Sequence, residues 1–199
     1  MIRKCVTGIG VLAMMISMCV DMGLAQESGQ DQQKMMEAYM KTGALNENHA
    51  FFKSFAGKWD VTTKAWMQPG AEPSLSQSTA RAELILGGRF LRIEITGTMF
   101  GQPFEGLQIL GYDNMKKKYN TFWIDSTSTA FFTTEGTRDE KSKVITETAE
   151  WADPMTGGTM KVKTKTTLIG EDEYVFEMFM VNPDGTEFKS LENRAKRKK

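Results

Sequence analysis

The sequence predicts an all-β protein: a single closed, antiparallel, up-and-down β-barrel of about ten strands, preceded by one or two short N-terminal helices. Three observations support this fold class. Gly57-Lys58-Trp59 leads into the first segment of alternating polarity. From Lys58 onward, strand-length segments of period two follow one another to the C-terminus. The turns between them are short and rich in Gly, Pro, Asn and Asp, which favours a meander in which each strand pairs with the next.

The first 25 residues are expected to be a signal peptide. A short positive segment precedes an apolar stretch over residues 6–20, and small residues lead to a cleavage site after Ala25. Asp21 interrupts this stretch before it reaches the roughly 18–20 apolar residues that a transmembrane helix needs. We therefore expect an exported protein, periplasmic or secreted, without a transmembrane span. The alternative is a lipoprotein anchored through Cys19.

The cysteine content and the distribution of charge limit the functions that the mature chain could have. Cleavage after Ala25 would remove both cysteines, so the mature chain is expected to lack disulfides and thiol nucleophiles. The 25 basic and 25 acidic residues balance, but basic residues gather at the C-terminus and leave the barrel acidic. A basic tail over residues 196–199 suggests an envelope interaction module as one function. A solvated terminus is the other interpretation. No feature indicates nucleic-acid binding.

Four segments are expected along the chain: the signal peptide 1–25, a polar linker with short helices 26–56, the barrel 57–195 and the tail 196–199. Helical spacing of Met and Tyr predicts a helix over residues 34–41. Asn46 is the expected cap of a second helix that ends at Phe55. The apolar faces of both helices are expected to pack against the barrel or to plug one end. Strands are expected at residues 58–67, 77–86, 89–98, 104–112, 118–126, 129–136, 143–151, 159–169, 173–181 and 186–194.

The order and spacing of several motifs resemble a known family. Gly57-Lys58-Trp59 is similar to the first-strand motif of lipocalins and other calycins. A larger set of motifs comprises Gly87-Gly88-Arg89-Phe90-Leu91, Pro103-Phe104-Glu105-Gly106, Gly111-Tyr112-Asp113-Asn114, Trp123-Ile124-Asp125, Asp153-Pro154-Met155, Glu177-Met178, Met36-Glu37-Ala38-Tyr39-Met40 and His49. In this order and spacing, over roughly residues 35–192, the set resembles a bacterial domain-of-unknown-function family, number fifteen seventy-nine. This resemblance implies a calycin-like barrel and brings no established activity.

The chain offers little recognisable catalytic or metal chemistry. Its one histidine, His49, precedes the barrel, so a Ser-His-Asp triad is not expected. No barrel strand supplies a His or Cys ligand for haem, and three nitrogen or sulfur ligands for zinc cannot be assembled. The Asp and Asn residues of single turns lack the dense spacing of a calcium loop. We therefore predict no cofactor, no metal and no catalytic residue, and we expect His49 to cap or pack at the helix–barrel junction.

The candidate ligand-binding residues are side chains that could line the barrel lumen, because alternate residues of each strand face inward. Arg92 and Glu94 share one face of their strand, either outside as a solvated pair or inside as groups that orient a ligand. The abundant aromatic residues could line a cavity or fill it. The full set of lumen candidates is Trp59, Arg92, Glu94, Tyr119, Trp123, Met178 and Glu192.

The predicted function is binding of a small apolar or amphipathic molecule in the lumen, without catalysis. The enzymatic alternative is an isomerase or hydrolase that uses lumenal carboxylates, and it requires at least two of Arg92, Glu94, Glu150 and Glu192 in one pocket. The sequence leaves the oligomeric state and the ligand open. For barrel closure, Gly57 is expected to allow close backbone approach while Arg194 stacks on Trp59.

Overall fold

A computed structural model describes residues 29–99 and 101–199, so the expected signal peptide with Cys19 lies outside the described residues. The chain forms two compact units, one ending at Ala44 and one beginning at Leu45. In the first, residues 29–42 form a helix, which is longer than predicted. The large apolar side chains of this helix are 61–73% exposed. That they pack against the barrel stays a prediction. The described part of this unit has no second element to cover them. These side chains are Met35, Met36, Tyr39 and Met40.

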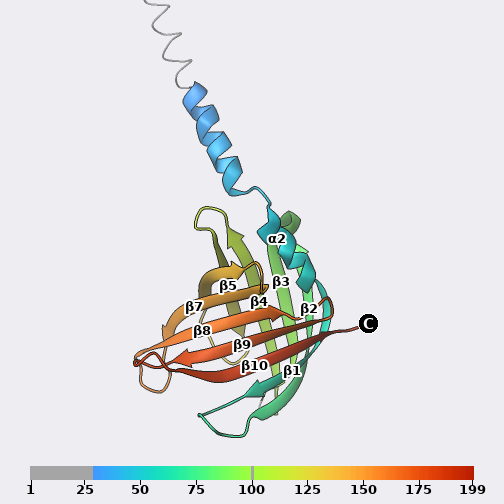
Figure 1. Ribbon diagram of the computed structural model, residues 1–199, viewed down its shortest axis with the longest axis vertical. Coiled ribbons are helices and arrows are strands. Elements are labelled where there is room, and N and C mark those ends of the chain that lie inside the picture. The colour runs from blue at the N-terminus through green and yellow to red at the C-terminus, as the bar shows by residue number, and fades with distance from the viewer. Residues whose placement is uncertain (1–28, 100) are drawn as a thin grey trace, which may run out of the picture. The chain divides into compact units, whose positions relative to one another are not determined.

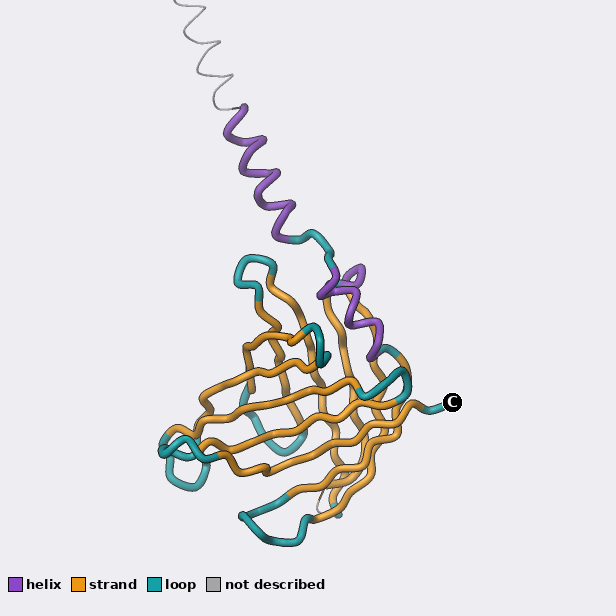
Figure 2. The backbone as a smooth tube through the Cα atoms, viewed as in Figure 1, coloured by secondary structure: helices purple, strands orange, loops and turns teal. Residues whose placement is uncertain are grey.

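The second unit is a closed barrel of ten antiparallel strands in which each strand pairs with its neighbour in sequence and β1 pairs with β10 (Figure 1). Short loops join the strands, as the predicted meander requires (Figure 2). The all-β, up-and-down fold class is confirmed. The strands are β1 (Gly57–Ala65), β2 (Ser74–Ile85), β3 (Phe90–Met99), β4 (Gln102–Asp113), β5 (Lys118–Asp125), β6 (Phe132–Asp139), β7 (Val144–Ala152), β8 (Thr159–Leu168), β9 (Glu173–Val181) and β10 (Glu187–Arg197).

Alternation along the strands sets which side chains reach the lumen. In β8, Val162 and Thr164 are buried while Lys161 is exposed, as the period of two predicts. In β1, Trp59 and Val61 are buried on the same inward phase. Because β1 starts at the end that Trp59 occupies and strand direction alternates, all odd-numbered strands start at this end. The even-numbered strands finish there.

A short helical segment closes this end of the barrel. Asn46 begins helix α2 (Glu47–Phe51), and its side chain accepts a hydrogen bond from the Asn48 backbone N–H at 3.0 Å. The His49 Nδ1 accepts the Asn46 backbone N–H in return, at 3.2 Å, which completes a capping box. Helix α2 continues into the 3₁₀ helix η1 (Phe52–Phe55). The predicted cap and the end of this second helix are confirmed.

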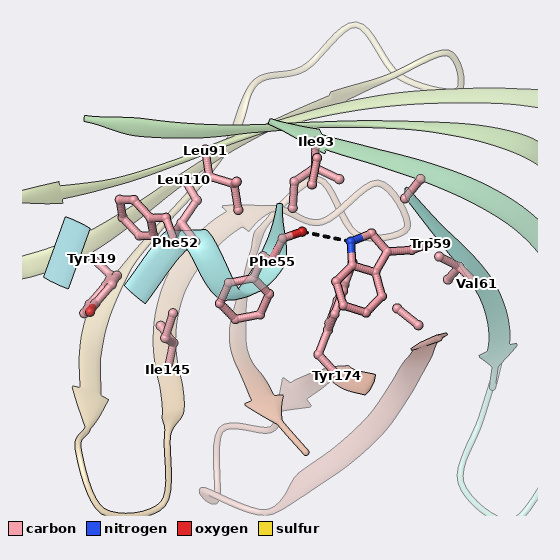
Figure 3. Close-up of a cluster of buried hydrophobic side chains, with 13 residues drawn as sticks. Phe52, Phe55, Trp59, Val61, Leu91, Ile93, Leu110, Tyr119, Ile145 and Tyr174 are labelled. Atoms are coloured by element: carbon pink, nitrogen blue, oxygen red, sulfur yellow. Dashed lines mark hydrogen bonds between the residues drawn. The ribbon is translucent and has the colours of Figure 1, made fainter. Parts of the chain in front are cut away.

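The main apolar core lies beneath this segment (Figure 3). Phe52, Phe55 and Trp59 are at most 2% exposed, and the Trp59 indole Nε1 donates a 2.8 Å hydrogen bond to the Phe55 carbonyl oxygen. Tyr174 of β9 packs edge-on against the rings of both Phe55 and Trp59, with centroid distances of 5.3 and 4.8 Å. The second predicted helix therefore plugs one end of the barrel with aromatic side chains.

The outer side of the plug carries an arginine, which is Arg197 and not the predicted Arg194. The Arg197 guanidinium carbon lies 4.2 Å from the centre of the Trp59 ring. Its Nη1 also donates to the Ala56 carbonyl at 2.6 Å, and a Cβ at Gly57, where φ is +132°, would lie 2.5 Å from that nitrogen. Glycine is therefore needed at position 57 for this close approach, as predicted.

The prediction for Arg194 fails because of strand phase. Trp59 pairs with Arg197 across β1 and β10, and Ala195 is fully buried on the same phase. Arg194 is one position out of phase, so its guanidinium points outward and forms an ion pair with Glu173. The expected free basic tail is also shorter than predicted. Lys196 and Arg197 belong to β10, and the Lys198 backbone N–H donates to the Lys58 carbonyl at 2.8 Å.

Candidate functional site: a cavity in the barrel lumen

The lumen beyond the plug contains a cavity of about 360 Å³. Its walls come from inward residues of all ten strands, with Phe55 at the plugged end. Aliphatic side chains surround the part nearest the plug, and these are Val61, Leu91, Ile93, Leu110 and Ile145. Small polar side chains widen the wall made by β1 and β2, where Thr63, Ser76 and Ser78 line the cavity. The barrel is therefore not filled by its side chains.

Aromatic residues gather toward the opposite end of the lumen. Trp123 and Trp151 lie near the last residues of β5 and β7, whereas Phe104 and Phe132 lie near the first residues of β4 and β6. The Phe104 and Trp123 rings are stacked with centroids 6.3 Å apart, and those of Phe132 and Trp151 meet edge-on at 4.9 Å. The Trp123 ring passes over Gly106, where a Cβ would lie 2.3 Å from it. We call these four residues the aromatic mouth.

A buried carboxyl group, Glu147 of β7, interrupts the apolar wall. It is 4% exposed and shares the inward phase with Ile145. The Thr121 hydroxyl of β5 lies 3.1 and 3.0 Å from its two carboxyl oxygens. Across the neighbouring strands, Glu147 pairs with Gly136 of β6 and Thr164 of β8. None of these neighbours carries a charge that could compensate an ionised carboxylate.

This environment changes the acidity of Glu147. Burial disfavours the charged form and raises the pKa of its carboxyl from 4.5 to about 7, while the hydroxyls of Thr121 and Thr134 act against this increase. Thr134 lies close enough to favour the anion, although no hydrogen bond of normal geometry joins it to the carboxyl group. Near neutral pH, Glu147 can therefore be either a hydrogen-bond donor or an anion.

Asp125 and Asn193 are among the other polar residues that line the cavity, together with Gln108 and several Ser and Thr residues. Asp125 lies at the end of β5, beside the aromatic mouth, and accepts hydrogen bonds from Trp123 Nε1 at 2.7 Å and the Thr127 backbone N–H at 2.8 Å. Asn193 of β10 also lines the cavity, and its Oδ1 is buried without a hydrogen-bond partner. The cavity thus combines an apolar interior with acceptor groups at separate depths.

The structure places four of the predicted lumen residues inside the barrel. Trp123 and Met178 line the cavity. Trp59 and Tyr119 are instead buried in the core around the plug. The Tyr119 hydroxyl donates to Asn48 Oδ1 at 3.0 Å, and burial raises the pKa of this phenol to about 12. Trp59 and Tyr119 therefore hold the plug, while Trp123 and Met178 remain candidates for ligand contact.

The other predicted lumen residues lie outside. Arg92 forms ion pairs with Glu83 and with Glu94, the latter at 3.5 Å, on the outer face of β3. Glu192 pairs with Lys189 at 2.7 Å. Leu91, Ile93 and Leu191 occupy the inward phase on these strands, so the charged residues between them must face outward.

Glu150 is also outside, 63% exposed and 3.7 Å from Lys161. Among the residues proposed for the enzymatic alternative, none lines the cavity, so they do not converge in one pocket.

His49 packs at the helix–barrel junction. It is 6% exposed, and its ring lies edge-on to those of Phe52 and Tyr112. Burial lowers the pKa of the imidazole, which favours the neutral form that accepts the Asn46 N–H. This histidine serves the capping box and lies apart from the cavity-lining residues.

Glu147 is the residue that reasoning from the sequence missed. The signal was available, because Ile145, Glu147, Ala149 and Trp151 share one phase of β7 and three of them are apolar. The sequence-based candidate on this strand is Glu150, which lies on the opposite phase.

Two further features concern metal ions and membranes. Within residues 29–99 and 101–199, no group of three His, Cys, Asp or Glu side chains could hold a metal ion. Over the same ranges, none of the helices combines the length and the apolar character needed to cross a membrane.

The fold and cavity define a closed up-and-down β-barrel with a cavity in its lumen. The sequence profile of a family described as "Protein of unknown function (DUF1579)" matches residues 44–197, and the chain belongs to this family. No match was found among curated proteins.

Two solved structures are similar to this chain, and the first of them supports the architecture. The S-type phycobiliprotein lyase CPES from Guillardia theta is 11% identical and has a TM-score of 0.54, over 80% of this chain and 97% of that chain. A redesigned β-barrel is 17% identical with a TM-score of 0.38, over 74% of this chain and 95% of that chain. At these identities the similarity to the lyase concerns the fold alone.

Proposed function

We propose that this protein is exported and binds a small apolar or amphipathic molecule in the barrel lumen without transforming it. The observation that carries the proposal is the cavity of about 360 Å³, which lies within the usual range for small-molecule sites. Its walls are predominantly apolar and carry polar groups such as Glu147, Asp125 and Asn193, the combination by which such sites bind and orient a ligand.

The closed end supports a binding role because it makes the lumen a pocket instead of a channel. The plug of Phe52, Phe55 and Trp59 is fixed by hydrogen bonds and by the stacked Arg197. A ligand would enter past the aromatic mouth, where flat π-faces offer contact to apolar or cationic groups. The barrel would hold this shape before the ligand arrives, which reduces the entropic cost of binding.

Export rests on the N-terminal sequence, with its positive segment, its apolar stretch and the small residues before Ala25. The expected mature chain would lack cysteine, so oxidising surroundings would not affect its fold. Fractionation of cells that produce the full chain, with N-terminal sequencing of the product, tests this part. A product that begins at Gln26 outside the cytoplasm supports it, and an intact cytoplasmic chain contradicts it.

Binding can be tested with a neutral fluorescent probe, N-phenyl-1-naphthylamine, and by native mass spectrometry of the purified protein. Ser76 lines the cavity, whereas the adjacent Gln77 is exposed on the other face of β2. We expect Ser76→Phe to fill the lumen and weaken probe binding at least tenfold. Gln77→Phe adds the same ring outside the barrel and should leave binding unchanged. Equal binding by both variants, or no binding by the wild type, would contradict the proposal.

A further inference from the structure

The polar groups of the cavity indicate which kind of amphipathic molecule fits. Two carboxyl groups, Glu147 and Asp125, line the cavity, and in the described part of the chain no Lys, Arg or His side chain does so. The elements packed against Glu147 face it with Thr121 from β5, Thr134 and Gly136 from β6, and Thr164 from β8. Arg138 follows on the same phase of β6, but its guanidinium carbon lies over the Phe51 ring of α2, 4.4 Å from the ring centre. Among the described residues, an ionised Glu147 therefore has no cation paired with it.

The other polar groups that line the cavity are uncharged amides and hydroxyls, such as Gln108, Asn193 and Thr166, apart from the carboxyl group of Asp125. The Asn193 Oδ1 is buried without a donor. Asp125 accepts hydrogen bonds from Trp123 and Thr127, which fix its carboxyl group beside the aromatic mouth. The ring faces of Trp and Phe at this mouth attract cations and repel anions. Tyr174, the other ionisable group that lines the cavity, stays neutral because burial raises the pKa of its phenol.

From this arrangement we infer that the lumen is selective for hydrophobic amines, whose ammonium group pairs with Glu147 while the apolar portion fills the cavity. The inference rests on the proposed binding function and specifies its ligand class. A carboxylate ligand is disfavoured because it would face Glu147 and Asp125 with no compensating cation. A neutral alcohol can form a hydrogen bond with Glu147. When Glu147 is ionised, however, the alcohol supplies no positive charge to pair with the carboxylate.

The inference predicts a proton exchange on binding. Free Glu147 is largely protonated below its pKa of about 7, and the bound ammonium favours the carboxylate. The carboxyl proton therefore leaves to solvent as the amine, already protonated, enters. At pH 6 we expect close to one proton to be released per amine bound, and the amine affinity should rise about 30-fold between pH 5.5 and pH 8.

Three probes with one apolar chain test the selectivity: n-octylamine, n-octanol and octanoate, each competing with N-phenyl-1-naphthylamine. At pH 8 we expect octylamine to bind more tightly than octanol, and octanol more tightly than octanoate. Calorimetry in buffers of different ionisation enthalpy measures the released proton. An octanol affinity equal to that of octylamine, or an amine affinity that falls as the pH rises, would overturn the inference.

Substitutions test which carboxyl group causes the preference for the amine. Glu147→Gln keeps the shape of the side chain, and we expect it to lower the advantage of octylamine over octanol at least tenfold and to abolish proton release. Glu150→Gln, on the outer face of the same strand, should change neither. Loss of the advantage in Asp125→Asn with its retention in Glu147→Gln would contradict the assignment. If neither the neutral probe nor any octyl compound binds, the binding function itself fails. Binding without preference rejects the amine selectivity alone.

Discussion

Replacing Arg197 by alanine is the most direct test of how the barrel closes. The guanidinium carbon lies 4.2 Å from the centre of the Trp59 ring, and its nitrogens donate to the carbonyl oxygens of Ala56 at 2.6 Å, Ser54 at 3.0 Å and Glu171 at 2.8 Å. The side chain is 27% exposed. It therefore connects the plug, β10 and the turn before β9 through a single group.

The expected effect follows from these contacts. A partly desolvated cation–π contact contributes about 1 kcal/mol. Each of the two part-buried hydrogen bonds to Ala56 and Ser54 involves a charged donor and contributes about 1.5 kcal/mol, since removal leaves a carbonyl without its partner. The ion pair with the exposed Asp172 adds almost nothing. Arg197→Ala should therefore lower the free energy of unfolding by about 3–5 kcal/mol, or Tm by roughly 6–20 °C.

Thermal and urea unfolding of the mature chain, followed by tryptophan fluorescence, measure this loss. Arg194→Ala is the matched control because the Arg194 side chain is 48% exposed and pairs with Glu173 on the outer face. We expect it to lower the free energy of unfolding by at most about 1 kcal/mol. If the two variants lose the same stability, the stacked arginine does not close the barrel and the argument from strand phase is wrong.

Three further predictions concern stability. In the ligand-free protein, the pKa of Glu147 is raised to about 7, so between pH 4.5 and about 7 the folded state binds more protons than the unfolded chain. The free energy of unfolding should therefore fall as the pH rises through this range. Glu147→Gln should thus be more stable than the wild type at pH 8, by on the order of 2–3 kcal/mol in urea unfolding, and equal to it near pH 4.5; a constant difference at both pH values would contradict this. Gly136→Ala should strongly lower Tm in thermal unfolding, because the added Cβ would lie 1.8 Å from the Thr146 carbonyl oxygen. Gly170→Ala is the control: a Cβ at position 170 would meet no atom within 4 Å, so this variant should have the Tm of the wild type. Asn46→Ala should lower unfolding free energy by about 1 kcal/mol in the same measurement, since it removes the cap of α2, and no loss would show that the plug holds without it.

Much of the barrel could be predicted because two short-range signals agree along the chain. Period-two alternation fixes which residues of β8 face inward, and turn residues such as Gly87 and Gly88 fix where strands end. The last strand shows the limit of this reasoning. Its alternation continues through Lys196 and Arg197, which composition alone assigns to a solvated tail. Pairing with β1 on one side and with β9 on the other keeps them in the sheet.

The candidate site was harder to predict because it depends on the phase of each strand. Arg92 and Glu94 draw attention as charged residues among apolar ones, yet an outward charged residue between inward Leu and Ile is the ordinary pattern of a half-buried strand. Glu147 is the opposite case, a carboxyl group on the phase of Ile145. Whether such a group meets a cation depends on inward residues of β5, β6 and β8, which lie far away in sequence.

The two ends of the barrel differ in how densely they are packed. The plug gathers the large buried side chains and the Arg197 contacts, so the fold is held where the aromatic core is dense. The lumen beyond it keeps small residues such as Ser76 and Ser78, and it carries Glu147 at an inward position. A core selected for stability alone would replace this carboxyl group with an apolar side chain, because its ionisation is unfavourable in the free protein. Such a local departure from good packing is expected where a ligand supplies the missing partner, and pairing with a ligand cation would remove the penalty that Glu147 carries at neutral pH.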